Sequence, residues 1–165
     1  MTKPANFILV IIHVALFAIM AWALYGAQFD IWNSQIPGSG EDGAKNYYTV
    51  AYHIEHDTSY AWFDGMNYPY GEHVVYTDNQ PVISNSLKLL SGSADLLPWL
   101  VFLSILIGSL CLQYVALQAG APWWLALMGA LCVVFISPQL LRLGGHYSLA
   151  YVAIIPIVIL LLWKS

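Results

Sequence analysis

Long runs of apolar residues are the feature that most restricts how this chain can fold. Three of them, Phe7–Tyr25, Pro98–Leu117 and Trp123–Leu141, approach the roughly 20 residues that a helix needs to cross a bilayer. A fourth run, 147–163, is shorter and contains Pro156. Only 8% of the residues are charged, against about 25% in soluble domains. The sequence therefore predicts an all-α membrane protein, a single module with about four transmembrane helices.

The few charged residues predict the orientation of the chain. All nine acidic residues lie between Asp30 and Asp95. Lys3 precedes the first run and Lys164 follows the fourth, so the positive-inside tendency places both ends in the cytoplasm. The segment 26–97 is then a large extracytoplasmic loop, and the connection between the third and fourth runs returns to the same side. The scattered bases form no cluster that would suit a nucleic acid.

The first run has an alternative interpretation as a cleaved signal peptide. Ala21-Trp22-Ala23 resembles a cleavage site for such a peptide. The apolar run is longer than the roughly 7–15 residues of a signal-peptide core. A retained transmembrane helix is therefore expected.

The acidic loop contains a helical pattern of its own. Ser39 followed by Asp42 has the spacing of a helix start, and aromatic and apolar residues then recur with a helical period from Ala44 to His56. Residues 64–71 are rich in turn-forming types, and 82–90 can form a second short helix. Because tyrosine is enriched at membrane surfaces, both helices are expected to lie at the interface.

The acidic pair Glu41-Asp42 is the first candidate for chemistry in this loop. A carboxylate held just outside the membrane can take a proton from an acceptor hydroxyl. It can also bind a divalent cation such as Mg²⁺ or Mn²⁺ through its oxygens, with Asp42 as the metal ligand. The simpler explanation is a solvated helix start, where acidic side chains complement the helix dipole.

Aromatic and polar side chains alternate through the second part of the loop. Rings can stack on the apolar faces of a sugar while amides and carboxylates bond its hydroxyls. The predicted substrate-binding residues are Tyr68, Tyr70, Glu72, His73, Asp78, Asn79 and Gln80. A folded loop whose aromatic rings contact the bilayer surface would have the same composition.

Arg142 and His146 follow the third run, on the side predicted to carry the acidic loop. An arginine beside a membrane is costly unless it is paired. Its guanidinium group suits a phosphate, and His146 would add a donor. Ordinary snorkelling of Arg142 to the interface is the alternative.

Three other histidines have less specific settings. His13 lies in the middle of the first run, where a lone polar residue more often bonds a neighbouring helix than a cofactor. His53 and His56 have a spacing that can ligate a metal, but no third ligand follows at a telling distance. Two polar residues on the wet face of a helix are the simpler explanation.

Several strings taken together resemble one family. The chain has EDG at 41–43, DGMNYPYGEHVVYTDNQP at 64–81 and SPQLLRLGGHYSLAYVAIIPIVILLL at 137–162. This arrangement is similar to the N-terminal part of GT-C membrane glycosyltransferases, above all to a bacterial multi-pass branch. The wider group includes protein mannosyltransferases, oligosaccharyltransferases and aminoarabinose transferases.

The resemblance implies an inverting transfer of a sugar from a polyprenyl-phosphate-linked donor to a glycan, lipid or protein acceptor, on the outer side of a bacterial inner membrane. By resemblance, Asp42 takes the position of the catalytic base, with Glu41 beside it. Arg142 and His146 lie, by topology, near the place of the lipid phosphate. GT-C enzymes share more than four spans and often have a soluble outer domain, so this chain is expected to be a fragment of a larger GT-C core.

Two other functions fit parts of the pattern. A transporter or lipid-binding subunit would use the same cavity for a polar solute, although intramembrane ionisable residues are scarce. Solute uptake without donor turnover would favour it. A small haem-binding protein would use His13 and His146, which lie toward different depths, and the absence of a Soret band would exclude it.

Overall fold

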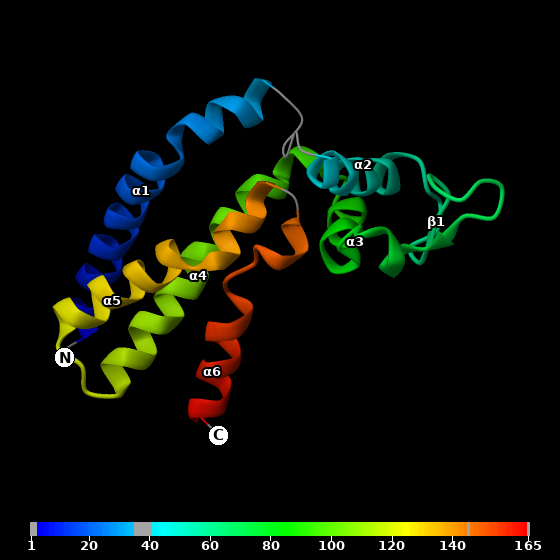
Figure 1. The fold of residues 1–165 in the computed structure, drawn as a ribbon. Helices are drawn as coiled ribbons and strands as arrows, with labels where there is room; N and C mark the ends of the chain where they lie inside the picture. Colours follow the sequence, from blue (N-terminus) through cyan, green and yellow to red (C-terminus); the bar gives the residue numbers. More distant parts are fainter. Residues whose placement is uncertain (1–2, 35–40, 145, 165) are drawn as a thin grey trace. The chain divides into compact units, whose positions relative to one another are not determined.

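The structure is a computed structural model that describes residues 3–34, 41–144 and 146–164. Within these ranges, the side chains of 3–6, 27–34, 41, 141, 143, 144 and 164 are not described. The chain is mostly helical (Figure 1). The α-helices, the strands and the short 3₁₀ helices (η) are α1 (Lys3–Ser34), α2 (Glu41–Glu55), β1 (Trp62–Phe63), β2 (Glu72–His73), η1 (Val74–Thr77), α3 (Pro81–Leu89), η2 (Ala94–Leu96), α4 (Leu97–Gln118), α5 (Trp123–Ile136), η3 (Pro138–Gly144), η4 (Tyr147–Leu149) and α6 (Ile154–Lys164).

Three helical segments of the described chain are long and apolar enough to cross a membrane. They are Phe7–Gly26, Ala94–Gln118 and Trp123–Leu140. These segments match the first three predicted spans and are compatible with the predicted all-α membrane class. The α-helix α5 itself ends at Ile136 because Ser137 precedes Pro138, and a residue before proline is disfavoured in helical conformation.

The segment predicted as the fourth span is an apolar stretch shorter than the other three. Its α-helical part, α6, begins only at Ile154, after the short η4 helix. Proline is tolerated in the first turn of a helix, where its missing N–H removes no hydrogen bond. The late start of α6 places Pro156 in that turn.

The chain forms two compact units, which we describe separately. The span unit takes its residues from 1–33, 101–140 and 151–165, and the loop unit from 34–100 and 141–150. The predicted outer loop therefore shares a unit with the connection that carries Arg142 and His146. The predicted helix start at Ser39 lies outside the described residues.

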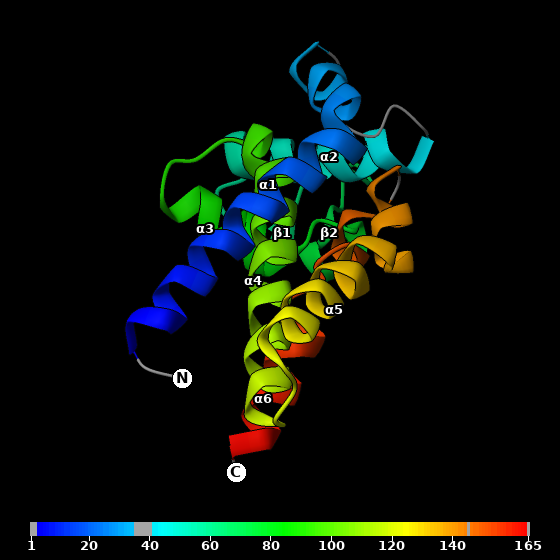
Figure 2. The same cartoon turned by 90° about the vertical axis from the view of Figure 1, so that its left-hand side faces the viewer.

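Polar and aromatic contacts join α1, α4 and α5 in the span unit. Nε2 of His13 on α1 lies 2.8 Å from Oγ of Ser109 on α4. The ring centroids of Phe17 on α1 and Phe135 on α5 are 5.2 Å apart. Figure 2 shows α4 and α5 side by side, joined by a short turn. The expectation that His13 bonds a neighbouring helix is confirmed.

A small-residue face of α4 packs against the backbone that leads into α6. Oγ of Ser104 accepts a hydrogen bond of 3.0 Å from the backbone N–H of Ala153. One turn further along α4, a Cβ added to Gly108 would lie 3.3 Å from the backbone of Ala153. Glycine at 108 therefore allows a close backbone approach that a larger residue would prevent.

Gly108→Val is expected to destabilise the span unit by roughly 1–3 kcal/mol, because two backbones would have to separate. Thermal unfolding of the detergent-solubilised protein measures this effect. Gly129→Val is the matched control, since a Cβ at Gly129 on α5 meets no atom within 4 Å. Equal stability of the two variants would contradict the close packing of α4.

The loop unit has its own hydrophobic core, to which α2, α3, η2 and the start of α4 contribute. Its buried side chains are Val50, Leu87, Ala94 and Leu97. Figure 1 shows α2 beside α3, with the hairpin of β1 and β2 next to them. The helices expected at 44–56 and 82–90 are present as α2 and α3, and Pro81 occupies a favourable first-turn position of α3.

A hydrogen bond connects α2 to η2 at the edge of this core. The hydroxyl of Tyr47 donates to Oδ1 of Asp95 over 2.5 Å. Burial, together with this bond, raises the pKa of Tyr47 to about 12. The hydroxyl is therefore protonated and able to donate at neutral pH.

His53 is the centre of a buried polar network between α2 and α3. Its Nδ1 lies 2.6 Å from Oδ2 of Asp57, and its Nε2 lies 2.9 Å from Oδ1 of Asn85. Lys88 donates from Nζ to the backbone carbonyls of Asp57 and Ser59. Both ring nitrogens of His53 thus have protein partners.

This network argues against a metal site shared by His53 and His56. His53 is fully buried, whereas the side chain of His56 is 60% exposed. A buried ring with oxygen partners on both sides has no free nitrogen for a metal. The structure therefore favours a structural role for His53.

Candidate functional site

Asp42 and His146 lie next to each other in the loop unit although they are distant in the sequence. Nε2 of His146 is 3.6 Å from Oδ2 of Asp42. This distance is too long for a hydrogen bond but suits an ion pair with a protonated imidazole. The side chain of His146 is 39% exposed and that of Asp42 is 67% exposed, so both can contact a ligand.

Local structure explains how the pair is held. Asp42 is the second residue of α2, and its backbone carbonyl accepts a 2.8 Å hydrogen bond from Nδ2 of Asn46 one turn later. The backbone N–H of His146 donates a 2.9 Å hydrogen bond to the carbonyl of Arg142 in η3. Arg142 is exposed. Glu41 is the first residue of α2, and its side chain lies outside the description.

Lys45 is a neighbour of Asp42 that the sequence analysis did not single out. It follows Asp42 by three residues on α2, and residues at this spacing are neighbours on a helix surface. Its Nζ lies 3.1 Å from Oδ2 of Asp78, with both side chains part-exposed. The three-residue spacing between Asp42 and Lys45 is the sequence feature that could have identified Lys45 as a neighbour of Asp42. Around Asp42 the structure thus shows His146 as an ion-pair partner and Lys45, paired with Asp78, as a neighbour on the same helix. A place for the Arg142 guanidinium in this site stays a prediction.

The exposed rings among the predicted substrate-binding residues lie at the other end of α2. Tyr68 and Tyr70 are 93% and 82% exposed, and they belong to the connection between β1 and β2. The hairpin packs on the later part of α2, where the ring centroids of Tyr52 and Phe63 are 5.4 Å apart. The ten residues from Asp42 to Tyr52 span about 15 Å of helix. Asp42 and these tyrosines are therefore separate parts of the surface.

The remaining predicted substrate-binding residues have individual settings. Glu72 accepts a 2.8 Å hydrogen bond from Nδ2 of Asn67, and Nδ1 of His73 accepts one from the backbone of Val75. Asp78 is the partner of Lys45. Asn79 is fully buried and donates from Nδ2 to the carbonyl of Thr49 over 2.6 Å, and Gln80 is buried as well. Asn79 and Gln80 therefore belong to the interior of the loop unit.

Asp42 is also the predicted ligand of a divalent cation. Among the side chains that the structure describes, no group of three or more His, Cys, Asp or Glu residues is placed to hold a metal ion. The side chain of Glu41 is outside that set. Mg²⁺ or Mn²⁺ at Asp42 stays a prediction.

Comparisons with known proteins give a family. The three long apolar helices and the separate polar unit have the features of a helical membrane protein. The family model described as "Domain of unknown function (DUF6311)" matches residues 12–165. This match covers most of the chain, which therefore belongs to the DUF6311 family. No curated protein and no solved structure gives a match.

Proposed function

We propose that this chain forms part of a GT-C type membrane glycosyltransferase that transfers a sugar from a polyprenyl-phosphate-linked donor. The observation that supports this most is the pair of Asp42 and His146. A carboxylate at the start of the first loop helix lies beside an imidazole from the third-to-fourth connection. This reaction needs a general base beside the acceptor and a positive group beside the leaving phosphate, on opposite faces of the anomeric carbon, and the loop unit carries both kinds of group.

In the proposed reaction, the carboxylate of Asp42 takes the proton of an acceptor hydroxyl. The hydroxyl oxygen then forms a bond to the anomeric carbon, and the bond from that carbon to the phosphate oxygen breaks. The polyprenyl phosphate leaves with the electron pair, and the anomeric configuration inverts. Arg142 and His146 offset the charge of the leaving phosphate. General-base assistance of this kind contributes roughly 10²–10⁴-fold to the rate.

The exposed tyrosines would serve the acceptor in this scheme. Tyr68 and Tyr70 belong to the hairpin that packs on the later part of α2 at Tyr52, and the helix rises about 15 Å from Asp42 to Tyr52. This separation exceeds the size of one sugar ring, so these rings would contact a distant part of an extended glycan, lipid or protein acceptor. The loop unit would face the extracytoplasmic side of a bacterial inner membrane.

Binding of decaprenyl phosphate to the full-length protein tests the phosphate site without knowledge of the sugar. Arg142→Ala is expected to weaken binding by roughly tenfold or more, because a hydrogen bond between charged groups is lost. Decaprenol, which lacks the phosphate, is the control ligand and should bind equally to both proteins. An equal loss for both lipids would contradict a phosphate site at Arg142.

A transporter or lipid-binding subunit is the alternative, and one observation in the span unit favours it. His13, Ser109 and Gln113 are buried polar residues on the apolar helices α1 and α4. Polar groups within membrane segments often mark solute pathways. Uptake of a polar solute by reconstituted protein, without consumption of a polyprenyl-phosphate sugar, would favour this function.

A further inference from the structure

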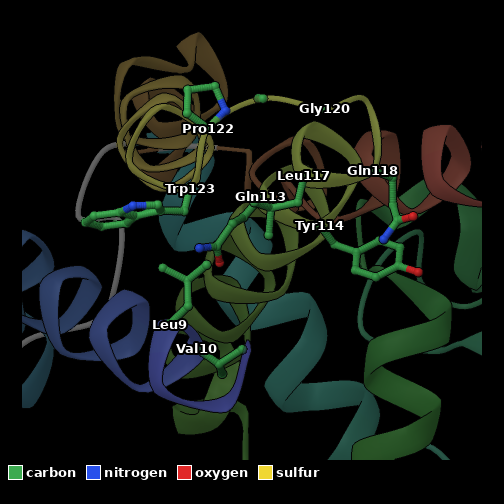
Figure 3. Close-up of a pocket in the computed structure, with 10 residues that line it drawn as sticks. Leu9, Val10, Gln113, Tyr114, Leu117, Gln118, Gly120, Pro122 and Trp123 are labelled. Atoms are coloured by element: carbon green, nitrogen blue, oxygen red, sulfur yellow. The ribbon is translucent and has the colours of Figure 1, made fainter. Parts of the chain in front are cut away.

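The span unit contains a cavity that the proposed sugar transfer does not use. It has a volume of about 640 Å³ and lies between the first turns of α1, the end of α4, the connection 119–122 and the start of α5. Cavities that bind small molecules commonly measure about 300–1,000 Å³. Figure 3 shows the lining residues, among them Leu9, Val10 and Leu117. The cavity is thus large enough for part of a lipid and mostly apolar.

One polar atom of the lining, the amide nitrogen of Gln113, has no hydrogen-bond partner among the described residues, while the same side chain also interacts with His13. The side chain of Gln113 is buried, with 3% of the residue exposed, and its Nε2 makes no hydrogen bond to any described residue. Figure 3 shows the amide of Gln113 directed toward Leu9. A buried donor without an acceptor costs about 1–3 kcal/mol. An acceptor oxygen supplied by a ligand would remove this cost.

The depth of Gln113 indicates which ligand can supply that oxygen. Gln113 lies five residues before the end of α4 at Gln118, or about 8 Å along the helix. Tyr114 and Trp123 also line the cavity, and such residues are enriched where the hydrocarbon meets the headgroups. In a phospholipid, the groups at this level are the acyl ester carbonyls, which only accept hydrogen bonds.

We propose that this cavity binds a membrane glycerophospholipid, with an acyl chain against Leu9, Val10 and Leu117 and an ester carbonyl that accepts from Nε2 of Gln113. The cavity is built by α1, α4 and α5 within the span unit alone. It lies at the N-terminal end of α1 and the C-terminal end of α4, whereas the loop joins the opposite ends of these two helices. The site is therefore independent of Asp42 and of the proposed sugar donor.

The test uses two photoactivatable phosphatidylcholines that differ only in an ester or ether linkage to the glycerol. The full-length protein is reconstituted into dioleoylphosphatidylcholine vesicles with either probe, and labelled peptides are quantified by mass spectrometry. We expect label on the peptides that contain Leu9–Val10 and 113–123. The ester probe should label roughly twofold to tenfold more strongly than the ether probe, as one net hydrogen bond predicts.

Gln113→Leu should abolish the preference for the ester probe, because the donor is removed. Gln118→Leu is the matched control, since Gln118 lines the same cavity but is exposed, and it should keep the preference. The ester-to-ether ratio is measured within each variant, so reduced folding cannot imitate the result. Equal labelling by both probes in the unaltered protein, or label spread evenly over α1 and α6, would overturn the proposal.

Discussion

Asp42→Asn in the full-length protein is expected to lower the turnover of sugar transfer by roughly 10²–10⁴-fold. Asparagine has the same shape as aspartate, but its amide cannot take the proton of the acceptor hydroxyl. The His146 side chain would lose an anionic neighbour and keep its place. The loss should therefore appear in kcat, while the binding of decaprenyl phosphate changes little.

Glu55→Gln is the control for this variant. Glu55 is the last residue of the same helix, α2, and its side chain is 62% exposed with no part in the proposed site. The turnover of sugar transfer by Glu55→Gln should equal that of the unaltered protein within experimental error. Transfer rates of Asp42→Asn equal to those of Glu55→Gln would show that Asp42 is not the base.

Asp57→Ala is expected to destabilise the loop unit strongly, by more than Gly108→Val destabilises the span unit. The side chain of Asp57 is almost completely buried and accepts from Nδ1 of His53 and from the backbone N–H of Asp64. Removal of one member of a buried, hydrogen-bonded pair costs roughly 3–5 kcal/mol. Its partners would be left buried without acceptors.

Hydrogen exchange of the α2 and α3 amides measures this local stability. In Asp57→Ala both helices should lose protection together, because the network joins them. Glu55→Ala removes an exposed carboxylate two residues earlier and should leave protection unchanged. Full protection of α2 in Asp57→Ala would show that the network does not hold the two helices together.

The apolar runs and the helical period of the loop were sufficient to predict the main helices. Length and composition alone identify the segments of α1, α4 and α5 that can cross a membrane. The spacing of tyrosines predicts α2, and a proline at the first position marks α3. These features are local, so the sequence displays them directly.

Contacts between distant residues were harder to predict. Topology placed His146 on the same side as Asp42, but their distance of 3.6 Å depends on tertiary packing. His53 looked like an exposed polar residue, and its partner Asn85 comes from another helix. The aromatic and polar pattern of 68–80 predicts one binding site, whereas Asn79 is buried and Tyr68 lies on the hairpin. The length of α2 separates Asp42 from the hairpin, and tertiary contacts bury Asn79 and His53. The residue types alone show neither effect.

The most direct measurement is the fate of a polyprenyl-phosphate sugar incubated with the purified full-length protein and a mixture of membrane acceptors. We predict that polyprenyl phosphate is released in step with sugar transfer, and that the product has the inverted anomeric configuration. A donor that stays intact, while the protein moves a polar solute across the membrane, would contradict the proposed function.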